Sequence, residues 1–296
     1  MNGRNSVKRA IFTATFLLFS LQLIWAQDDA RSPEAGQAYN DGLNLVRKGK
    51  YEQAIPKFND AVKADDNFPN AHYMLGYCYK KKNNFSAAEK EYRQAIKLNS
   101  KFEKAYEALG NLHAQSANTS EAINTFNALL VINANNAKAN FGLGKIYYDQ
   151  KKYNDAADKL EKAVATQSKY VAAHNILGMT YKSNRQFSKS VTAFENAIKF
   201  EKKNSKKGTY YYQLGQVQIE AKQYKAAEAA LLNALKFSRN SSVVAGSNFY
   251  LGEVYKLTNR NQKALKFFER ATKNNRWKQA AEYEIDLIKN PDKYVR

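Results

Sequence analysis

The side chains best suited to chemistry in this sequence are few and scattered. They are three histidines, His72, His113 and His174, and a single cysteine, Cys78. Imidazole and thiolate groups bind metals or act as bases and nucleophiles when they converge, but no pair of His, Cys or carboxylate residues here has metal-ligand spacing. No nucleophile elbow and no phosphate-binding glycine loop is present. The sequence therefore predicts no catalytic residue, no metal site and no cofactor.

Glycine, rather than any reactive residue, recurs at a regular spacing in this sequence. Seven glycines are separated by 34, 34, 34, 34, 37 and 37 residues, and six of them follow a leucine: Gly42, Gly76, Gly110, Gly144, Gly178, Gly215 and Gly252. A fixed period of this length is typical of a solenoid built from one repeated supersecondary unit. Solenoids present extended surfaces for binding.

Numbering each unit so that this glycine is position 8 places the remaining apolar residues in register. Position 20 is alanine in six units, position 24 is always large and apolar, and position 27 is alanine in six units. The periodicity predicts two helices per unit, with positions 4, 7, 8 and 11 on one face of the first and 20, 24 and 27 on one face of the second. The small residues allow the helices to cross closely. His72 and His174 fall at position 4 and His113 at position 11, so all three are predicted core residues, as is Cys78.

This pattern resembles the tetratricopeptide repeat family, which has Leu-Gly at positions 7 and 8, Tyr at 11, Ala at 20, Phe or Tyr at 24 and Ala at 27. The resemblance implies an all-α fold, a right-handed superhelical solenoid of about seven helical hairpins. The family's Trp at position 4 and Pro at position 32 are absent, which blurs the expected helix ends. The expected repeats are 35–68, 69–102, 103–136, 137–170, 171–207, 208–244 and 245–276, followed by a capping helix and tail, 277–296. The two longer spacings predict longer helices or loops near 201–207 and 238–244.

The resemblance also implies where a partner binds. In tetratricopeptide arrays the first helices line a concave groove, and positions 2, 5, 9 and 12 point into it. Here those positions supply aromatic and basic or amide side chains suited to an extended, acidic segment: Tyr73, Tyr77, Lys80, Lys104, Asn111, Lys138, Phe141, Lys145, Tyr148, Asn175, Lys182, Tyr212, Phe249 and Lys256. The same residues also fit an ordinary amphipathic helix surface. The carboxylate clamp of chaperone-binding members is absent, since Gly142 occupies a position where it needs asparagine.

The N-terminus predicts export. Basic residues precede an uncharged apolar run from Ala10 to Ala26, which is typical of a cleaved signal peptide, 1–26, ahead of a short linker, 27–34. Ile24 is bulky for a cleavage site, so an uncleaved N-terminal anchor is the alternative. The expected location is the periplasm, with a secreted or anchored protein as the other possibilities.

The formal charge of +20, or +17 without residues 1–26, points to anionic partners. Export argues against nucleic acid. We expect a non-catalytic scaffold of the cell envelope that binds partner proteins in its groove. The alternative is a basic adaptor for cell-wall glycan or anionic lipid surfaces.

Overall fold

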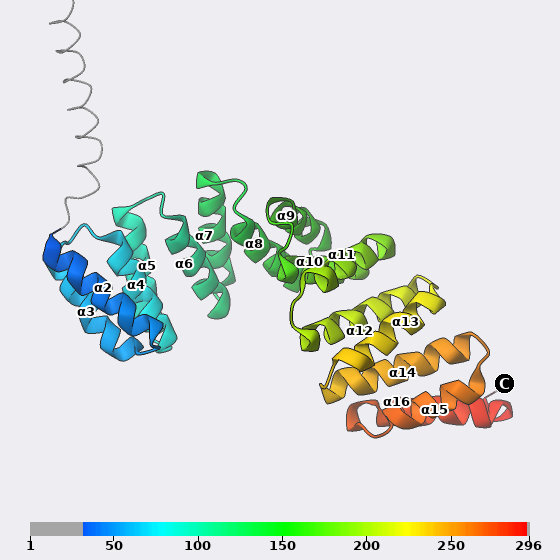
Figure 1. Ribbon diagram of the computed structural model, residues 1–296. Helices are drawn as coiled ribbons and strands as arrows, with labels where there is room; N and C mark the ends of the chain where they lie inside the picture. The colour runs from blue at the N-terminus through cyan, green and yellow to red at the C-terminus, as the bar shows by residue number, and fades with distance from the viewer. Residues whose placement is uncertain (1–31, 295–296) are drawn as a thin grey trace, which may run out of the picture. The chain divides into compact units, whose positions relative to one another are not determined.

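The computed structural model describes residues 32–294 (Figure 1). The predicted signal segment and most of the linker lie outside the described residues. Within these bounds every regular element is helical, and no helix has both the length and the apolar character needed to cross a bilayer. The described chain forms two compact units, one ending at Ala117 and the other beginning at Asn118. The division falls between the two helices of the third expected repeat.

The first unit, which we call unit 1, contains five helices. They are α2 (Pro33–Arg47), α3 (Tyr51–Ala64), α4 (Pro69–Lys81), α5 (Phe85–Leu98) and α6 (Glu103–Gln115). Each packs against the next in sequence. We call the first helix of each repeat the A helix and the second the B helix, so that α2, α4 and α6 are A helices.

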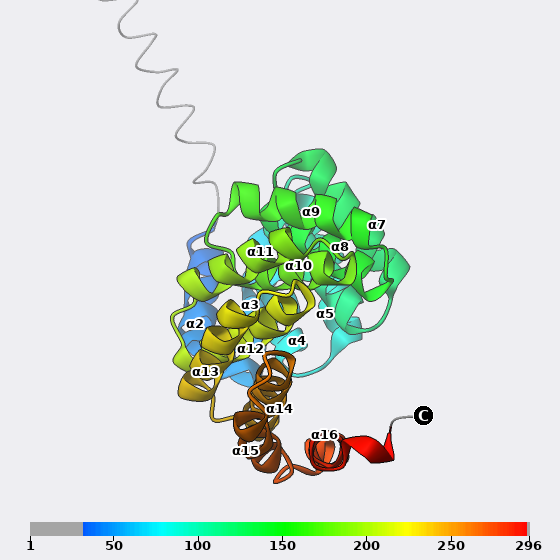
Figure 2. The same ribbon diagram turned by 90° about the vertical axis from the view of Figure 1, so that its right-hand side faces the viewer.

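The second unit, unit 2, contains the remaining ten α-helices and a terminal 3-10 turn. They are α7 (Thr119–Ile132), α8 (Ala137–Asp149), α9 (Tyr153–Thr166), α10 (Val171–Ser183), α11 (Phe187–Phe200), α12 (Asn204–Glu220), α13 (Tyr224–Phe237), α14 (Ser241–Leu257), α15 (Asn261–Ala271), α16 (Asn275–Lys289) and η1 (Pro291–Lys293). Its A helices are α8, α10, α12 and α14. Figure 2 gives a second view of the helices from α7 onward.

The recurring glycine is where the two helices of a hairpin touch. A Cβ atom placed on it would lie 2.5–2.9 Å from the large position-24 side chain, and this holds at Gly42, Gly76, Gly144, Gly178, Gly215 and Gly252. Real Cβ contacts are not that short, so any side chain here would push the helices apart. The partners Phe58, Tyr92, Leu160, Phe194, Leu231 and Phe268 are all fully buried. The predicted role of positions 8 and 24 in helix crossing is confirmed in these six hairpins.

The turn between the A and B helices repeats one backbone conformation. Position 15 has a positive φ of 56–72° in every repeat, and it is Gly49, Asn83, Ala117, Lys151, Arg185, Lys222 or Asn259. The next amide then bonds the carbonyl five residues back, as in Lys50 N–H to Leu45 O at 2.9 Å. Only the first repeat uses glycine, the residue for which this conformation costs nothing.

The extra residues of the two 37-residue spacings lengthen the A helix that follows each of them. Helices α12 and α14 have 17 residues, whereas α4, α6, α8 and α10 have 13. Because α12 and α14 begin earlier relative to their glycine, their first turns extend over the junctions that precede them. Gly208, in the first turns of α12, lies against Ser238, and its Cβ would come within 2.6 Å of the Ser238 nitrogen.

Helix α16 covers the end of the last repeat. Ala281 is fully buried there, and the Trp277 ring lies 4.9 Å from that of Phe249 and 5.6 Å from that of Tyr250. Helix α16 ends at Lys289, shortly before Pro291.

Candidate functional site

The histidines and the cysteine are structural. His113 and His174 are buried, and His174 bonds the carbonyl oxygen of Ser168 at 2.8 Å. His72 lies 2.6 Å from the Glu91 carboxylate in a half-buried pair. Cys78 is fully buried, and burial raises its thiol pKa to about 11. Among the described residues no group of three or more His, Cys, Asp or Glu side chains is arranged to hold a metal ion.

The aromatic residues predicted to line the groove at position 5 are partly used in packing. The Tyr73 ring lies 5.4 Å from that of Phe102, and the Phe141 ring lies 4.9 Å from that of Tyr170. The same pairing joins Tyr39 to Phe68 at 4.8 Å. Each pair joins position 5 to position 34 of one repeat. These rings therefore take part in packing within the repeat.

One predicted groove residue, Phe249, is buried. Phe249 is only 8% exposed, because Trp277 of α16 and the rings of Tyr250 and Phe268 enclose it. The capping helix α16 packs its Trp277 ring on this residue, so Phe249 is not available to a partner. Tyr212 belongs to the same aromatic group, with its ring 5.8 Å from that of Tyr250, and burial raises its pKa.

The predicted basic residues fall into two groups. Lys104, Lys138 and Lys145 are exposed, and so is the amide residue Asn111. Lys182 and Lys256 form ion pairs, Lys182 with Glu220 at 3.1 Å and Lys256 with Glu284. These two ammonium groups are already neutralised within the protein.

In unit 1 the predicted residues Tyr77 and Lys80 lie on α4. The Tyr77 ring lies 6.0 Å from that of Tyr51, and the Lys81 ammonium lies over both rings. Burial, together with the charge of Lys81, lowers the pKa of Lys80. This face is an aromatic and basic surface.

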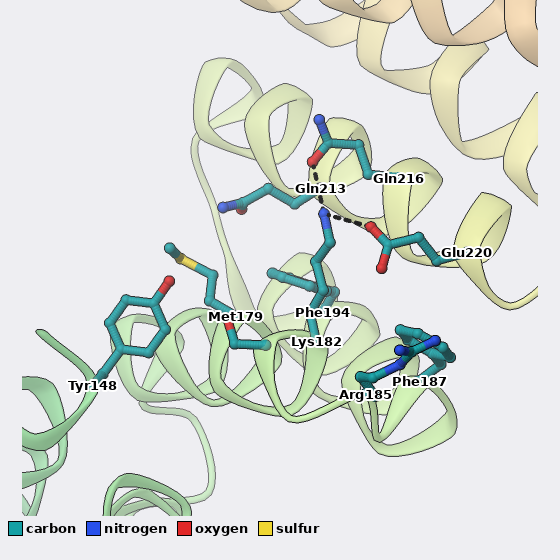
Figure 3. A pocket seen from close by; sticks show the side chains of 10 residues that line it. Tyr148, Met179, Lys182, Arg185, Phe187, Phe194, Gln213, Gln216 and Glu220 are labelled. Atoms are coloured by element: carbon teal, nitrogen blue, oxygen red, sulfur yellow. Dashed lines mark hydrogen bonds and ion pairs between the residues drawn. The ribbon is translucent and has the colours of Figure 1, made fainter. Parts of the chain in front are cut away.

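In unit 2 the structure brings two predicted residues, Tyr148 and Lys182, to one cavity of about 640 Å³ (Figure 3). The cavity lies between α10 and α12, with Tyr148 of α8 at one side. Its walls are Tyr148, Met179, Lys182, Ser183, Arg185, Phe187, Phe194, Gln213, Gln216 and Glu220. It occupies the place where the repeat spacing changes from 34 to 37 residues, next to the lengthened helix α12. A volume in this range is typical of ligand pockets.

The walls of this cavity combine apolar and amide groups. Met179, Phe187 and Phe194 supply apolar surface, while the Gln216 side chain accepts a bond from the Lys182 ammonium at 3.5 Å. The Oε1 atom of Gln213 is buried without a hydrogen-bond partner. A buried acceptor without a partner is costly, so it favours a ligand that brings an N–H group. Arg185 is exposed at the rim and forms no ion pair in the described chain.

Met179 and Gln216 were missed from the sequence, although both stand at position 9, which the family register directs into the groove. The prediction selected aromatic, basic and asparagine residues and passed over methionine and glutamine. Asn175, which was predicted, is half-buried, with its amide 3.9 Å from the Met179 sulfur.

The comparisons with known proteins agree with this architecture. Tetratricopeptide repeat profiles match residues 39–101, 79–137 and 107–172, and then 171–204, 208–241 and 245–276. The chain therefore belongs to the tetratricopeptide repeat family, and its fold is the all-α solenoid of that family. The last three matches begin at 171, 208 and 245, where the glycine register begins units five to seven. No curated protein matches the sequence significantly.

Solved structures with similar folds come from several bacteria. The C-terminal part of a tetratricopeptide repeat protein from Cytophaga hutchinsonii has a TM-score of 0.67 and 16% identity, covering 83% of this chain and 99% of that one. A tetratricopeptide repeat protein from Parabacteroides merdae has a TM-score of 0.57 and 18% identity, covering 88% and 100%. PilF of Pseudomonas aeruginosa has a TM-score of 0.59 and 16% identity, covering 74% and 98%. At these identities the likeness shows the fold alone.

Proposed function

We propose that this protein is a non-catalytic scaffold of the cell envelope that binds partner proteins through the A-helix face of unit 2. The family supports protein–protein interaction as the general role. The N-terminal sequence, basic and then apolar up to Ala26, supports export to the periplasm.

The cavity beside Met179 carries this proposal. An extended peptide lying across α10 and α12 would place one large apolar side chain against Met179 and Phe187. Its backbone N–H would bond Gln213 Oε1, and a carboxylate nearby would meet the guanidinium of Arg185. Amide side chains suit peptide backbone because each offers both a donor and an acceptor.

The test is to select peptides from a random library on the full chain and to measure their affinity by fluorescence anisotropy. Met179→Glu places a charge in the apolar wall, so we expect a loss of about tenfold or more in affinity for the selected peptides. Asn111→Glu is the matched control, since Asn111 stands at the same repeat position in unit 1 and is exposed. We expect it to leave the affinity within about twofold of wild type.

Thermal melts of both variants distinguish lost binding from lost structure. Peptides that bind the Met179→Glu variant as well as they bind the wild type, in a protein that still melts cooperatively, would contradict a partner site at this cavity. Equal losses in the two variants would place the site elsewhere on the molecule.

A further inference from the structure

The structure of unit 2 carries a second surface, formed by the junctions between each B helix and the next A helix. We propose that this surface is a docking site for an anionic lipid bilayer. We call it the junction edge and define it by eight basic residues: Lys169, Lys202, Lys203, Lys206, Lys207, Arg239, Lys273 and Arg276. The proposal does not depend on the cavity or on the groove partner.

The junctions lie along one side of unit 2. Successive helices run in opposite directions, so every B-to-A junction falls at the same end of its hairpin, and Figure 1 shows those before α12, α14 and α16 at one side of the array. Close contacts join them. Gly208 of α12 touches Ser238 in the next junction, and Gly246 of α14 touches Trp277, the neighbour of Arg276. These contacts hold the three junctions next to one another.

These charges are not neutralised within the protein. None of the eight forms an ion pair in the part of the chain that the structure describes, and all but Lys207 are exposed. The guanidinium of Arg239 bonds only the backbone carbonyls of Lys236 and Ser238. At the opposite ends of the hairpins acidic residues lie among the cations, and two of the cations there are paired, Lys182 with Glu220 and Arg260 with Glu228. Other cations at that end, such as Lys152 and Lys225, are exposed and form no ion pair in the described chain.

The lengthened helix α12 concentrates this charge. Its first turn and the residues before it place four lysines within the segment 202–207. The one acidic residue nearby is Glu201, whose carboxylate accepts the backbone N–H groups of Lys202 and Lys203, each at 2.9 Å. The three extra residues between Gly178 and Gly215 therefore extend α12 at its N-terminus and present lysines there.

The chemistry of the edge favours lipid headgroups over other polyanions. Six of the eight residues are lysines, which act as mobile point charges, whereas arginine suits fixed bidentate recognition. No large apolar or aromatic side chain in these junctions is exposed in the described chain. Nucleic acid bases and sugar rings are bound by exposed aromatic rings, so the edge lacks the surface for stacking them. A bilayer with phosphate headgroups needs only a row of accessible cations.

Sedimentation with lipid vesicles tests this proposal on the full chain. Wild type should bind phosphatidylglycerol-containing vesicles much more tightly than phosphatidylcholine vesicles, and the difference should vanish as NaCl rises from about 0.05 to about 0.5 M. The apolar N-terminal run and the basic residues before it are the same in every variant, so the comparison between variants isolates the junction edge. The variant K202Q/K203Q/K206Q/K207Q should lose about a hundredfold or more of the affinity for the anionic vesicles.

The matched control removes four exposed lysines from the other faces of unit 2, K152Q/K225Q/K263Q/K266Q, with the same change in net charge. We expect it to lose less than about tenfold. Equal losses in the two variants would overturn the proposal, because attraction would then follow net charge alone. So would equal binding to both vesicle types, or binding to soluble polyphosphate without binding to the vesicles.

Discussion

Units 1 and 2 are built from the same hairpin but differ in charge and in regularity. Residues 27–117 contain 14 basic and 12 acidic residues, whereas residues 118–296 contain 30 and 15. Unit 1 keeps the 34-residue spacing, and unit 2 contains both 37-residue repeats, the cavity and the junction edge. The glycine contacts are the same in both, so the fold constrains positions 8 and 24 but leaves surface charge and A-helix length free to differ. We therefore expect the specific function to depend on the features found in unit 2, which are its longer A helices, its cavity and its junction edge.

The largest expected difference between the units concerns the capping helix. Trp277→Ala should lower the free energy of unfolding of unit 2 by about 3 kcal/mol, since it removes the ring packed on Phe249 and Tyr250. Hydrogen exchange read peptide by peptide should show faster exchange in α14 to α16 and no change in unit 1. Trp277→Phe is the control, because Trp277 Nε1 is buried without a hydrogen-bond partner, and it should cost less than about 1.5 kcal/mol. Equal acceleration in α2 to α5 would refute independent stability of the two units.

An intermediate difference concerns pH. Burial, and then the neighbouring carboxylate of Glu284, raises the pKa of Glu253 from 4.5 to about 7, while Lys256 acts in the opposite direction. The folded state therefore holds this proton where the unfolded state has lost it, so the contribution to stability is complete below pH 4.5 and is lost as the pH rises through 7.

The variant Glu253→Gln isolates that group. It should be more stable than wild type by about 1–2 kcal/mol at about pH 8, and the advantage should disappear near about pH 5. Urea unfolding at several pH values measures it, with the tyrosines Tyr212 and Tyr250 neutral throughout this range since burial raises both pKa values. A stability difference that stays constant with pH would contradict the raised pKa.

The smallest difference concerns the turn at position 15, which is glycine in unit 1 at Gly49 and lysine in unit 2 at Lys222, with φ of 72° and 59°. Lys222→Gly should stabilise the protein by about 0.5–1 kcal/mol, and Gly49→Ala should destabilise it by a similar amount. Thermal melts measure both. Lys266→Gly, in the middle of α15, should instead cost about 1 kcal/mol because glycine weakens a helix interior. Stabilisation by both lysine replacements would exclude backbone conformation as the cause.

The sequence predicted the hairpins, the helix-crossing glycines and the core positions of His113, His174 and Cys78, because a period of 34 residues fixes which side chains meet inside a repeat. It did not predict which groove positions are covered. Phe249 is buried by a helix that follows the repeats, and the rings of Tyr73 and Phe141 are partly used by position 34. The position of a residue within the repeat predicts the direction of its side chain. It does not predict which side chains of other helices pack against it. The cavity at Met179 and Gln216 depends on the spacing between α10 and α12, which no single repeat encodes.

The full burial of Cys78 allows its thiol to report on local opening of unit 1. A thiol with a pKa of about 11 and no solvent access reacts with alkylating reagents only when the helices around it open. Its labelling rate in the unmodified protein therefore measures the opening of α3 and α4, without a probe being added. For the same reason, a cysteine introduced on the A-helix face of unit 2 can be labelled selectively, leaving the natural thiol silent while partner binding is followed.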